Sequence, residues 1–396
     1  MPDLDADVVV VGLGIMGSAT LWRLAARGIA AVGIDRHHPP HTFGQSKGES
    51  RMLRRVQFEG DQYVALGRLA YELWADLERE IGQAIFRRTG MLVIGPPKSQ
   101  LIEGGRESAR LGGMDIESLD AVALRSRHPQ HLVADDEIAL FDPEGGYASP
   151  DLAIDAMLRL AVAAGASTRL GCAVTSITHG DRDVVLATPE GNVRARQVVV
   201  AAGAWLPTLL PQFASAIAIE RHCYAHVRVI EPAAFVPERF PVWIRENGAN
   251  TGLSIHSSHS HKKRIFAFGF PTLDGARVKV GFPVTGAIVE LAGMDHEPWP
   301  AERQAFESGR LQAVLAGLAP GFEEFTVCHY DNSADFDFIV GPLPASPRIT
   351  VLGGFSGHGF KHAPAIAECA AALVAGVAPS VDIERFSPAR KALTVT

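Results

Sequence analysis

The fold of this 396-residue chain is decided by the stretch Asp7-Val8-Val9-Val10-Val11-Gly12-Leu13-Gly14-Ile15-Met16-Gly17-Ser18. Its four consecutive valines are typical of a strand that is buried on both faces of a parallel sheet. Gly12, Gly14 and Gly17 then form a GxGxxG sequence. Glycines at this spacing permit a tight turn, close approach of the backbone to a pyrophosphate, and close packing of a helix on the strand.

The residues after this stretch complete a strand–helix–strand unit. An apolar helical pattern covers residues 19–25, Gly28 ends it, and a second apolar strand covers 29–34 and leads to Asp35. A pyrophosphate would lie at the positive end of the helix, and Asp35 would accept hydrogen bonds from the ribose hydroxyls of adenosine. We therefore predict a dinucleotide site rather than a plain structural turn, although the motif does not distinguish FAD from NAD.

Composition sets limits on the remaining function classes. Hydrophobic residues make up 47% and charged residues 20%, which indicates an ordinary folded protein of about two domains. The formal charge is 37 − 44 = −7, and because no basic block occurs we expect no nucleic-acid partner. Four scattered cysteines form no CxxC pair, which argues against a zinc site and against a disulfide framework. The simplest interpretation of these cysteines is four reduced thiols without a special role.

Targeting and membrane signals are absent from the sequence. The chain begins with acidic residues before its first apolar run, whereas a signal peptide begins with basic ones. No apolar run reaches the roughly 18 residues of a membrane-spanning helix. We expect a cytoplasmic protein without membrane contact.

Two further segments repeat the pattern of a buried strand followed by glycine. Residues 197–202 lead to Gly203, and residues 349–352 lead to a glycine-rich loop and an Ala-rich helix at 363–375. Since strands from the start, middle and end of the chain would share one sheet, we predict an interrupted nucleotide-binding domain. The segments 86–145 and 219–324 would form the substrate domain.

At this point the whole chain resembles the monomeric sarcosine oxidase and N-methyltryptophan oxidase family of FAD-dependent amine oxidases, within the D-amino-acid-oxidase-like superfamily. Pipecolate oxidases belong to the same group. Besides the Gly12 motif, the resemblance is carried by Pro39-Pro40-His41-Thr42, Gly48-Glu49-Ser50-Arg51, Cys328-His329-Tyr330-Asp331-Asn332-Ser333 and Gly354-Phe355-Ser356-Gly357-His358-Gly359-Phe360-Lys361. The last two segments are much more specific than GxGxxG.

The resemblance implies an α/β fold with an FAD-binding, Rossmann-like domain and an antiparallel-sheet, α+β substrate domain. The FAD-binding domain would be assembled from residues 1–85, 146–218 and 325–396. The implied reaction is oxidation of the C–N bond of an N-methyl or cyclic α-amino acid to an imine, which then hydrolyses, with O2 reduced to hydrogen peroxide. The partners would be a small amine substrate and O2, and members of the family are often monomers.

The resemblance also implies roles for individual side chains. Cys328 would be bonded through sulfur to the 8α-methyl group of FAD, and Tyr330 would face the substrate. Arg54 and Lys361 would bind the substrate carboxylate, for which a guanidinium offers a bidentate match and an ammonium a point charge. The predicted catalytic residues are Lys279, Arg51 and Tyr330. Lys279 would activate O2 near flavin N5 by stabilising developing superoxide, and Arg51 would lie near the flavin.

The predicted cofactor-binding residues come from every part of the expected FAD domain. They are Gly12, Gly14, Gly17, Ser18, Asp35, Arg36, Ser46, Val174, Gly203, Cys328, Gly354, Gly357, Gly359 and Lys361.

Several positions depart from the family pattern. Lys47 and Pro283 stand where histidines are common, and Phe268 and Gln57 replace pocket tyrosines. We predict Lys47, Phe268 and Gln57 as substrate-binding residues with Arg54 and Lys361. Because these changes alter the residues expected to face the substrate, we expect a substrate that is bulkier than sarcosine or is cyclic.

Two polar clusters are predicted to have no catalytic role. The His-rich stretch 256–264 lacks accompanying acids or cysteines, so we expect a solvated hairpin loop and no metal. Asp331, Asp335 and Asp337 are expected to be loop and surface residues.

Three alternatives to an oxidase stay open from the sequence alone. A flavin dehydrogenase would pass its electrons to an acceptor other than O2. An NAD-dependent dehydrogenase could use the same N-terminal unit. A flavin-stabilised binding protein would carry out no reaction.

Overall fold

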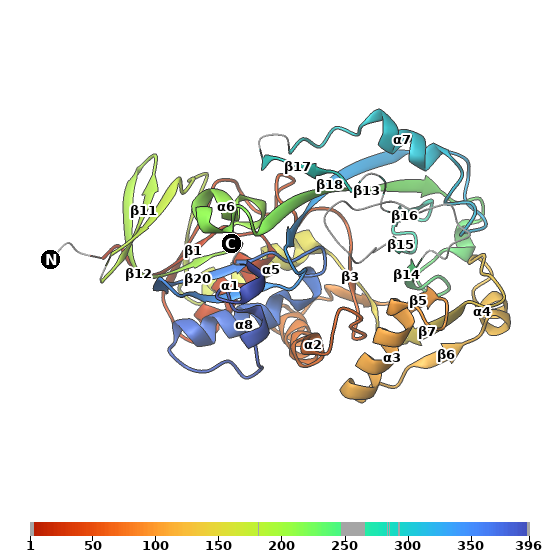
Figure 1. The fold of residues 1–396 in the computed structure, drawn as a ribbon, viewed down its shortest axis with the longest axis horizontal. Helices are drawn as coiled ribbons and strands as arrows, with labels where there is room; N and C mark the ends of the chain where they lie inside the picture. Colours follow the sequence, from red (N-terminus) through yellow and green to blue (C-terminus); the bar gives the residue numbers. More distant parts are fainter. Residues whose placement is uncertain are drawn as a thin grey trace.

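The computed structural model describes residues 4–180, 182–246, 266–282, 284, 286–291 and 294–393. Two lobes lie side by side, one built on each of two large sheets (Figure 1). The sheet of the first lobe has eight strands, five of which run parallel in the order β20-β12-β1-β2-β9. These strands are β1 (Ala6–Val11), β2 (Ala31–Asp35), β9 (Ser167–Leu170), β10 (Ser176–His179), β11 (Val184–Thr188), β12 (Gly191–Val200), β19 (Ile339–Leu343) and β20 (Ser346–Gly353).

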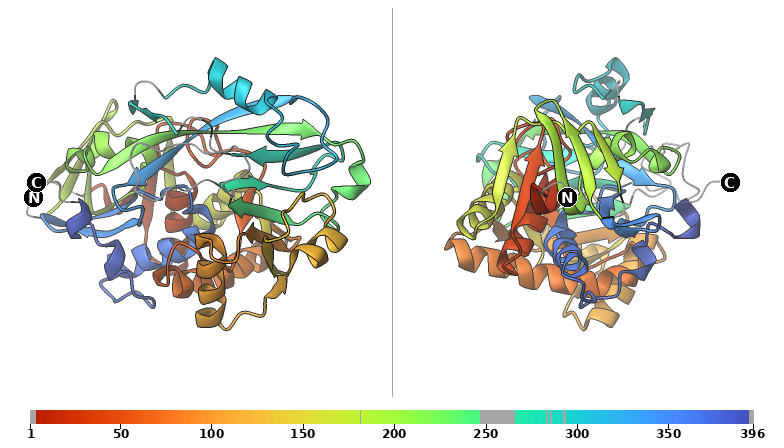
Figure 2. Two further views of the ribbon diagram at one scale, coloured as in Figure 1. Left: turned by 45° about the vertical axis from the view of Figure 1, so that its right-hand side comes forward. Right: turned by 90° about the vertical axis from the view of Figure 1, so that its left-hand side faces the viewer.

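Strand β1 is buried on both faces, as its four valines predict. Val8 and Val10 pack into the core between the sheet and its helices, while Val9 and Val11 pack into a second core on the opposite face of the sheet. The right-hand view of Figure 2 shows β1 within this sheet and the helices below it. Those helices are α1 (Ile15–Ala26), α2 (Gln62–Ile81), α5 (Pro150–Ala163) and α8 (Ala363–Val374).

The parallel order brings together the segments that the sequence assigns to one sheet. β1 and β2 come from the start of the chain, β12 from its middle and β20 from its end. The discontinuous α/β fold is thereby confirmed. A small three-stranded sheet of β3 (Arg51–Leu53), β8 (Gly146–Ala148) and β4 (Phe86–Arg88) connects this lobe to the next.

The second lobe contains a nine-stranded sheet that is antiparallel except at the β14–β5 pair. Its strands are β5 (Met91–Gly95), β6 (Glu117–Leu119), β7 (Ile138–Asp142), β13 (Ile217–Arg228), β14 (Val242–Glu246), β15 (Phe266–Gly269), β16 (Arg277–Gly281), β17 (Ile288–Val289) and β18 (Glu324–Ser333). The accompanying helices are α3 (Gln100–Gly112), α4 (Ala121–Arg127) and α7 (Pro300–Glu307). The short helix α6 (Leu206–Leu209) packs instead on the sheet of the first lobe.

Strands β13 and β18 join the two lobes. They pair antiparallel from Ile217 opposite Ser333 to His226 opposite Glu324, and the left-hand view of Figure 2 shows them running side by side. The predicted domain boundary between residues 218 and 219 lies inside β13, and the one at 325 lies at the start of β18. Because both strands cross a predicted boundary, the domain boundaries stay a prediction. The β13–β18 pair places side chains between the lobes.

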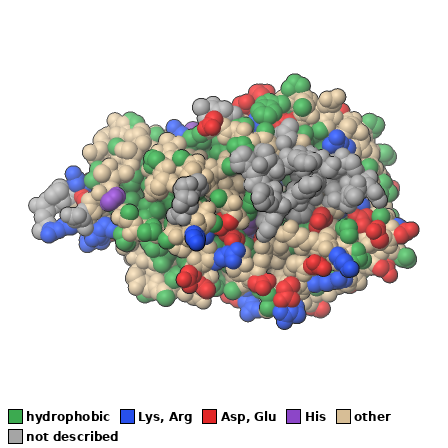
Figure 3. Space-filling view, viewed as in Figure 1, with side chains coloured by type: hydrophobic (Ala, Val, Ile, Leu, Met, Phe, Trp, Pro, Cys, Tyr) green, Lys and Arg blue, Asp and Glu red, His purple; other side chains and the backbone are tan. Residues whose placement is uncertain are grey.

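On the face seen in Figure 3, acidic and basic side chains are interspersed along the lower edge, so this face carries no large patch of one charge. No helix within the described ranges is long and apolar enough to cross a membrane.

Candidate active site

A cavity of about 700 Å³ runs between the lobes. One end is formed by the carboxyl ends of β1, β2 and β12, represented by Gly12, Asp35 and Ala201. The other end is lined by β13, β16 and β18 through His222, Lys279 and Cys328. Ligands of open α/β sheets bind outside the carboxyl ends of the strands. The cavity therefore joins a nucleotide-binding end to a region of different chemistry.

The glycine turn at the nucleotide end leaves no room for a side chain at Gly12 or Gly17. Gly12 has φ +87°, and a Cβ atom there would lie 2.5 Å from the carbonyl oxygen of Ala201. A Cβ atom on Gly17 would lie 1.7 Å from the carbonyl oxygen of Gly12. Gly14 caps α1 and lines the cavity, where a Cβ would come no closer than 3.5 Å to Ser46 Oγ. Gly12 and Gly17 are thus required by the fold, and Gly14 lines the cavity.

Asp35 ends β2 at the cavity wall. Its carboxylate accepts the N–H groups of Leu13 and His37, each at 2.7 Å. Burial would raise the pKa of Asp35, but hydrogen bonds from His41 and from these two N–H groups lower it below its ordinary value. The carboxylate both stabilises the glycine turn and lies at the predicted ribose position.

Of the other predicted cofactor residues, most line the cavity and Ser18 does not. Ser46 accepts the N–H of Ile15 at 3.2 Å, at the start of α1. The hydroxyl of Ser18 donates to the carbonyl of Leu13 at 2.7 Å instead. The remaining lining residues of this group are Arg36, Val174 and Gly203.

Asp331 connects β18 to the second glycine-rich loop. Its carboxylate accepts the Gly354 N–H at 2.9 Å and the Gln45 amide at 3.1 Å, and its carbonyl accepts the Ser356 N–H at 3.1 Å. Burial raises its pKa to about 6. The prediction of a surface residue was wrong for Asp331, because β18 continues inward to Ser333 and places this side chain at the cavity.

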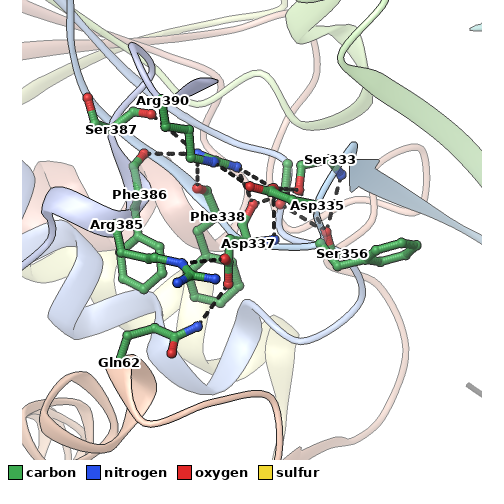
Figure 4. A network of polar contacts seen from close by, with 12 residues as sticks. Gln62, Ser333, Asp335, Asp337, Phe338, Ser356, Arg385, Phe386, Ser387 and Arg390 are labelled. Carbon is green, nitrogen blue, oxygen red and sulfur yellow. Dashed lines mark hydrogen bonds and ion pairs between the residues drawn. The ribbon is translucent and has the colours of Figure 1, made fainter. Parts of the chain in front are cut away.

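Asp337 and Asp335 belong to a structural network that Figure 4 shows. Asp337 is buried and accepts the Tyr63 hydroxyl at 2.8 Å and the Arg385 guanidinium at 2.8 Å. Asp335 is half-buried and pairs with Arg390 at 2.8 Å. The expectation of solvated surface acids was therefore wrong here too, since arginines near the C-terminus fold back over this turn.

The glycine-rich loop packs directly against Tyr330. A Cβ on Gly357 would lie 2.7 Å from the Tyr330 ring, so glycine allows the loop to approach. His222 stacks on the same ring at 3.9 Å between centroids. Gly357 and Gly359 line the cavity, while Gly354 is held by Asp331.

His222 and Glu220 were not among the predicted residues. Their Nε2 and Oε1 atoms lie 3.4 Å apart, and both side chains line the cavity on the face that carries Tyr330 and Cys328. Glu220, His222 and Tyr224 share one face of β13, but Arg221 lies between them, so the sequence shows no clean alternation that would have identified them.

Cys328 lies buried on the cavity wall, opposite His222 in the β13–β18 register. Burial raises the pKa of its thiol, whereas the positive charges of Arg51, Lys47, Lys279 and Arg221 oppose that shift. All four cysteines are free and buried, but Cys328 is the one surrounded by cations at the cavity.

Lys279 points inward from β16, as its alternation with apolar residues predicts. Its Nζ donates to the Ser50 carbonyl at 2.8 Å and lies 4.4 Å from the ring centre of Tyr224 and 4.8 Å from that of Phe270. Burial, and then the charge of Arg51, hold its pKa well below the ordinary value. Arg51 lines the same wall and donates to the carbonyls of Ser50 and Gln45.

Arg54 and Lys361 come together at the cavity, and a third residue joins them. Glu59 is ion-paired to Arg54 and lies 3.5 Å from Lys361 Nζ. Burial would raise the pKa of Glu59, but Arg54 and Lys361 hold it well below its usual range. Two cations thus share one carboxylate, which the sequence analysis missed although an acid five residues after Arg54 is visible there.

The three predicted substrate-wall residues are placed differently from one another. Phe268 lines the cavity beside Phe270. Among the described residues, Gln57 and Lys47 lie outside the lining. The Gln57 amide donates to the carbonyls of Arg54 and Arg55, while Lys47 Nζ lies 2.8 Å from His296 Nδ1.

Two predictions lie outside the described residues: the His-rich stretch 256–264 and the substitution at Pro283. Within the ranges that the structure describes, no group of His, Cys, Asp and Glu side chains has the arrangement of a metal site.

A family model for FAD-dependent oxidoreductases, designated DAO, matches residues 7–373. The N-methyl-L-tryptophan oxidase of Yersinia pestis (strain Pestoides F) is 31% identical over 392 residues, covering 98% of this chain and 100% of that protein. The enzyme of the same name from Yersinia pseudotuberculosis serotype O:1b (strain IP 31758) has the same identity and coverage.

Solved structures share the fold at lower identity. NikD, an unusual amino acid oxidase essential for nikkomycin biosynthesis, has a TM-score of 0.79 at 23% identity and covers 96% of this chain and 97% of its own. Glycine oxidase from Geobacillus kaustophilus has a TM-score of 0.76 at 19% identity, with 97% and 98% covered. L-proline dehydrogenase from P. horikoshii has a TM-score of 0.79 at 20% identity, with 98% of each chain covered.

Proposed function

Because this chain belongs to the DAO family of FAD-dependent oxidoreductases, we propose that it oxidises the C–N bond of an N-substituted α-amino acid. The observation that carries the proposal is the single cavity that joins the glycine turn to Lys279, Arg54 and Lys361. Its curated relatives at 31% identity are N-methyl-L-tryptophan oxidases, which supports an N-methyl amino acid as the substrate class.

The residues present fit FAD. The Gly12 turn and the first turn of α1 offer N–H groups to a pyrophosphate, and Asp35 lies where the ribose hydroxyls would be. At the far end, Lys279 and Arg51 supply positive charge next to aromatic walls. When bound there, FAD supplies the acceptor for the substrate hydride and a route for its electrons to O2.

The carboxylate end of the substrate would be held by Arg54 and Lys361. Both buried cations face the same cavity and both contact Glu59, so this end of the cavity carries the positive charge that a substrate carboxylate would need. Phe58 lies with its ring centre 3.8 Å from the Arg54 guanidinium carbon and fixes that side chain in place. The aromatic residues Phe268 and Phe270 provide room for an apolar substituent.

Lys279 is proposed to activate O2. Its ammonium is held by Ser50 and lies against two aromatic rings, a fixed charge in a dry environment. Such preorganised charge is effective because it requires no solvent rearrangement during reaction.

Cys328 is proposed to bond covalently to the 8α-methyl group of FAD through its sulfur. Its place on the cavity wall, where positive charges oppose the rise of its thiol pKa on burial, supports this assignment. The other three buried cysteines keep the interpretation of reduced thiols.

Purified protein tests these assignments in one series. We expect a yellow protein whose colour stays with the polypeptide after acid precipitation, and which N-methyl or cyclic amino acids bleach without oxygen. A colourless protein that retains NAD would contradict the flavin, and a yellow supernatant would contradict only the covalent bond. Peroxide formed during turnover distinguishes an oxidase from a dehydrogenase with another acceptor. Absence of bleaching by any amine would indicate a binding protein. A monomer in the cytoplasm completes the proposal, and sedimentation tests the former.

A further inference from the structure

Two turns at the cavity contain residues with an unusual backbone conformation. In the part of the chain that the structure describes, the non-glycine residues in the left-handed region are Phe336, with φ +63°, and Ser356, with φ +49°. Both line the cavity. Ser356 has a role in the fold, because its Oγ accepts the N–H of Ser333 at 3.2 Å. Left-handed backbone is costly for a bulky residue and persists only where the surroundings enforce it, so Phe336 requires an explanation of its own.

The turn between β18 and β19 that contains Phe336 is held by a residue near the C-terminus. Within the turn, the Phe336 N–H donates to the Ser333 carbonyl at 3.1 Å, and the Ser333 hydroxyl donates to the Asp337 carbonyl at 2.6 Å. Arg390 pairs with the Asp335 carboxylate at 2.8 Å and donates to the Asp337 carbonyl at 2.8 Å (Figure 4). These contacts enforce the left-handed conformation of Phe336.

His358 connects this turn to the carboxylate end of the cavity. Its Nε2 lies 3.3 Å from the Phe336 carbonyl oxygen, and its Nδ1 lies 3.9 Å from Glu59 Oε1. The His358 carbonyl accepts Lys361 Nζ at 3.0 Å. One histidine therefore separates the Phe336 backbone from the carboxylate that Arg54 and Lys361 share.

Apolar rings surround the cations at this end. Arg54 and Lys361 are each 4% exposed, although both line the cavity. The Phe58 ring centre lies 3.8 Å from the Arg54 guanidinium carbon, and Phe336 lines the same cavity with its side chain half-buried. The attraction between opposite charges is weak in water and much stronger where water is excluded. Rings beside the cation pair therefore strengthen the binding of a carboxylate.

We propose that Phe336 is a substrate-binding residue whose ring closes the carboxylate end of the cavity, and that Arg390 is a positioning residue that holds it there through Asp335. The inference rests on the proposed function, and it names what recognises one end of the amino acid. The ring keeps water away from the ion pair between the substrate carboxylate and the two cations. The strained backbone persists because it presents a ring at this position.

Two truncations separate the ring of Phe336 from its backbone. Phe336→Gly removes the ring and relieves the strain, since glycine adopts positive φ freely, whereas Phe336→Ala removes the ring and keeps the strain. Titration of the yellow holoprotein with acetate, followed by flavin absorbance, measures carboxylate binding without turnover. We expect the Kd for acetate to rise roughly 10-fold in both variants. The denaturant midpoint should nevertheless be lower for Phe336→Ala than for Phe336→Gly.

Turnover provides a second measurement of the same contact. With an N-methyl amino acid as substrate, KM should rise by the same factor in both variants while kcat changes little. The reason is that the ring contributes equally to binding of the carboxylate in the ground state and in the transition state. A purely structural role of Phe336 would instead make the loss follow the unfolding midpoint.

Arg390 is tested through its dependence on Phe336. Arg390→Met should weaken acetate binding, and Arg390→Lys, which keeps a charge for Asp335, should recover part of the loss. When Arg390→Met is combined with Phe336→Gly, the Kd for acetate should equal that of Phe336→Gly alone, because residues that act through one another have non-additive effects. Ala334→Gly is the matched control, since Ala334 is an exposed residue of the same turn, and it should leave the Kd unchanged.

The contrary outcomes are equally definite. If Phe336→Gly binds acetate as tightly as the wild type, or if the wild type binds no acetate, the proposal is overturned. Additive effects of the Arg390 and Phe336 substitutions would remove the positioning role of Arg390.

Failure of the proposed function itself is distinguishable. A wild-type protein that binds acetate through Phe336 but oxidises no amino acid would overturn the oxidase and leave the carboxylate site in place. Oxidation of N-methyl amino acids with an unchanged KM in Phe336→Gly would overturn this inference and leave the oxidase.

Discussion

The two ends of the cavity are built in different ways. At the nucleotide end, the ligand surface is mostly backbone, and its shape depends on glycines whose neighbours are main-chain atoms, such as the Gly12 carbonyl beside Gly17. At the substrate end, the surface consists of side chains from separate segments, including Arg54, Lys361 and Lys279. Gly12 and Gly17 at the first end tolerate no added atom, whereas the side-chain surface at the second end depends on how its charges are paired.

This difference predicts that the largest effect comes from the nucleotide end. Gly17→Ala puts a Cβ 1.7 Å from the Gly12 carbonyl oxygen, so α1 must move away from β1. We expect a loss of roughly 3 kcal/mol or more in the free energy of unfolding, and no FAD binding. Denaturant unfolding of the apoprotein and fluorescence titration with FAD measure both quantities.

Gly14→Ala is the matched control in the same motif. Its Cβ would meet only Ser46 Oγ at 3.5 Å, so the unfolding free energy of the apoprotein should change by less than about 1 kcal/mol. Because Gly14 faces the cavity, FAD binding should weaken nonetheless. Equal unfolding losses in the two variants would contradict the distinction between a packing glycine and a ligand-facing glycine.

The next largest effect is expected at Lys279. Replacing Lys279 with methionine removes the buried charge that Ser50 holds, and it should slow reoxidation by O2 roughly 10²- to 10³-fold. Flavin reduction by substrate should change much less. Stopped-flow measurement of the two half-reactions separates them, with Lys98→Met as the exposed lysine control. Equal slowing of both half-reactions would remove the assigned role.

The pH dependence of the same step has a definite sign. Burial holds the pKa of Lys279 well below its ordinary value, so the ammonium loses its charge at a lower pH than a free lysine. Reoxidation should therefore decline as pH rises through that lowered pKa, below the usual lysine range. Lys279→Arg should show no such decline, because a guanidinium stays charged.

The sequence predicts the two ends to different degrees for a physical reason. The valine run, Gly12 and Asp35 are neighbours in the chain, and local geometry requires them in that order. Glu59 and His222 were missed because their roles arise from contacts with residues far away in the chain, such as Lys361 and Tyr330. Lys47 was predicted to bind substrate because it stands where the family commonly carries histidine, and its contact with His296, 249 positions later, is invisible to local patterns.

Glu59 tests whether charge pairing governs the substrate end. Glu59→Gln leaves Arg54 and Lys361 buried without their carboxylate, which should cost about 3–5 kcal/mol of unfolding free energy. A small carboxylate such as acetate should restore part of that loss, about 2.7 kcal/mol at 100 times its Kd. Thermal unfolding at increasing acetate concentration measures the recovery.

A second buried pair provides the control for this experiment. Arg245 and Glu137 are buried in the second lobe, and among the described residues neither lines the cavity. Glu137→Gln should destabilise the protein by a similar amount, but acetate should not restore it. If acetate rescues both variants equally, or neither, the cationic pair at the cavity is not a carboxylate site.

A last effect depends on pH and concerns Asp331, where β18 of one lobe meets the glycine-rich loop of the other. Burial raises its pKa from 3.8 to about 6, so the native state favours the protonated form. Its contribution to stability is fully present below the unfolded pKa and is lost as pH rises through 6, by about 3 kcal/mol. Asp331→Asn abolishes this loss, so the stability difference between the wild type and the variant should shift by that amount between about pH 3.5 and 6.5. Asp335 has the opposite sign, since hydrogen bonds from Arg390 outweigh burial and lower its pKa. Asp335→Asn should therefore lose its effect on the unfolding free energy as pH falls. If the stability difference from the wild type changes with pH in the same direction for both variants, Asp331 does not lie in a water-excluded position between the lobes.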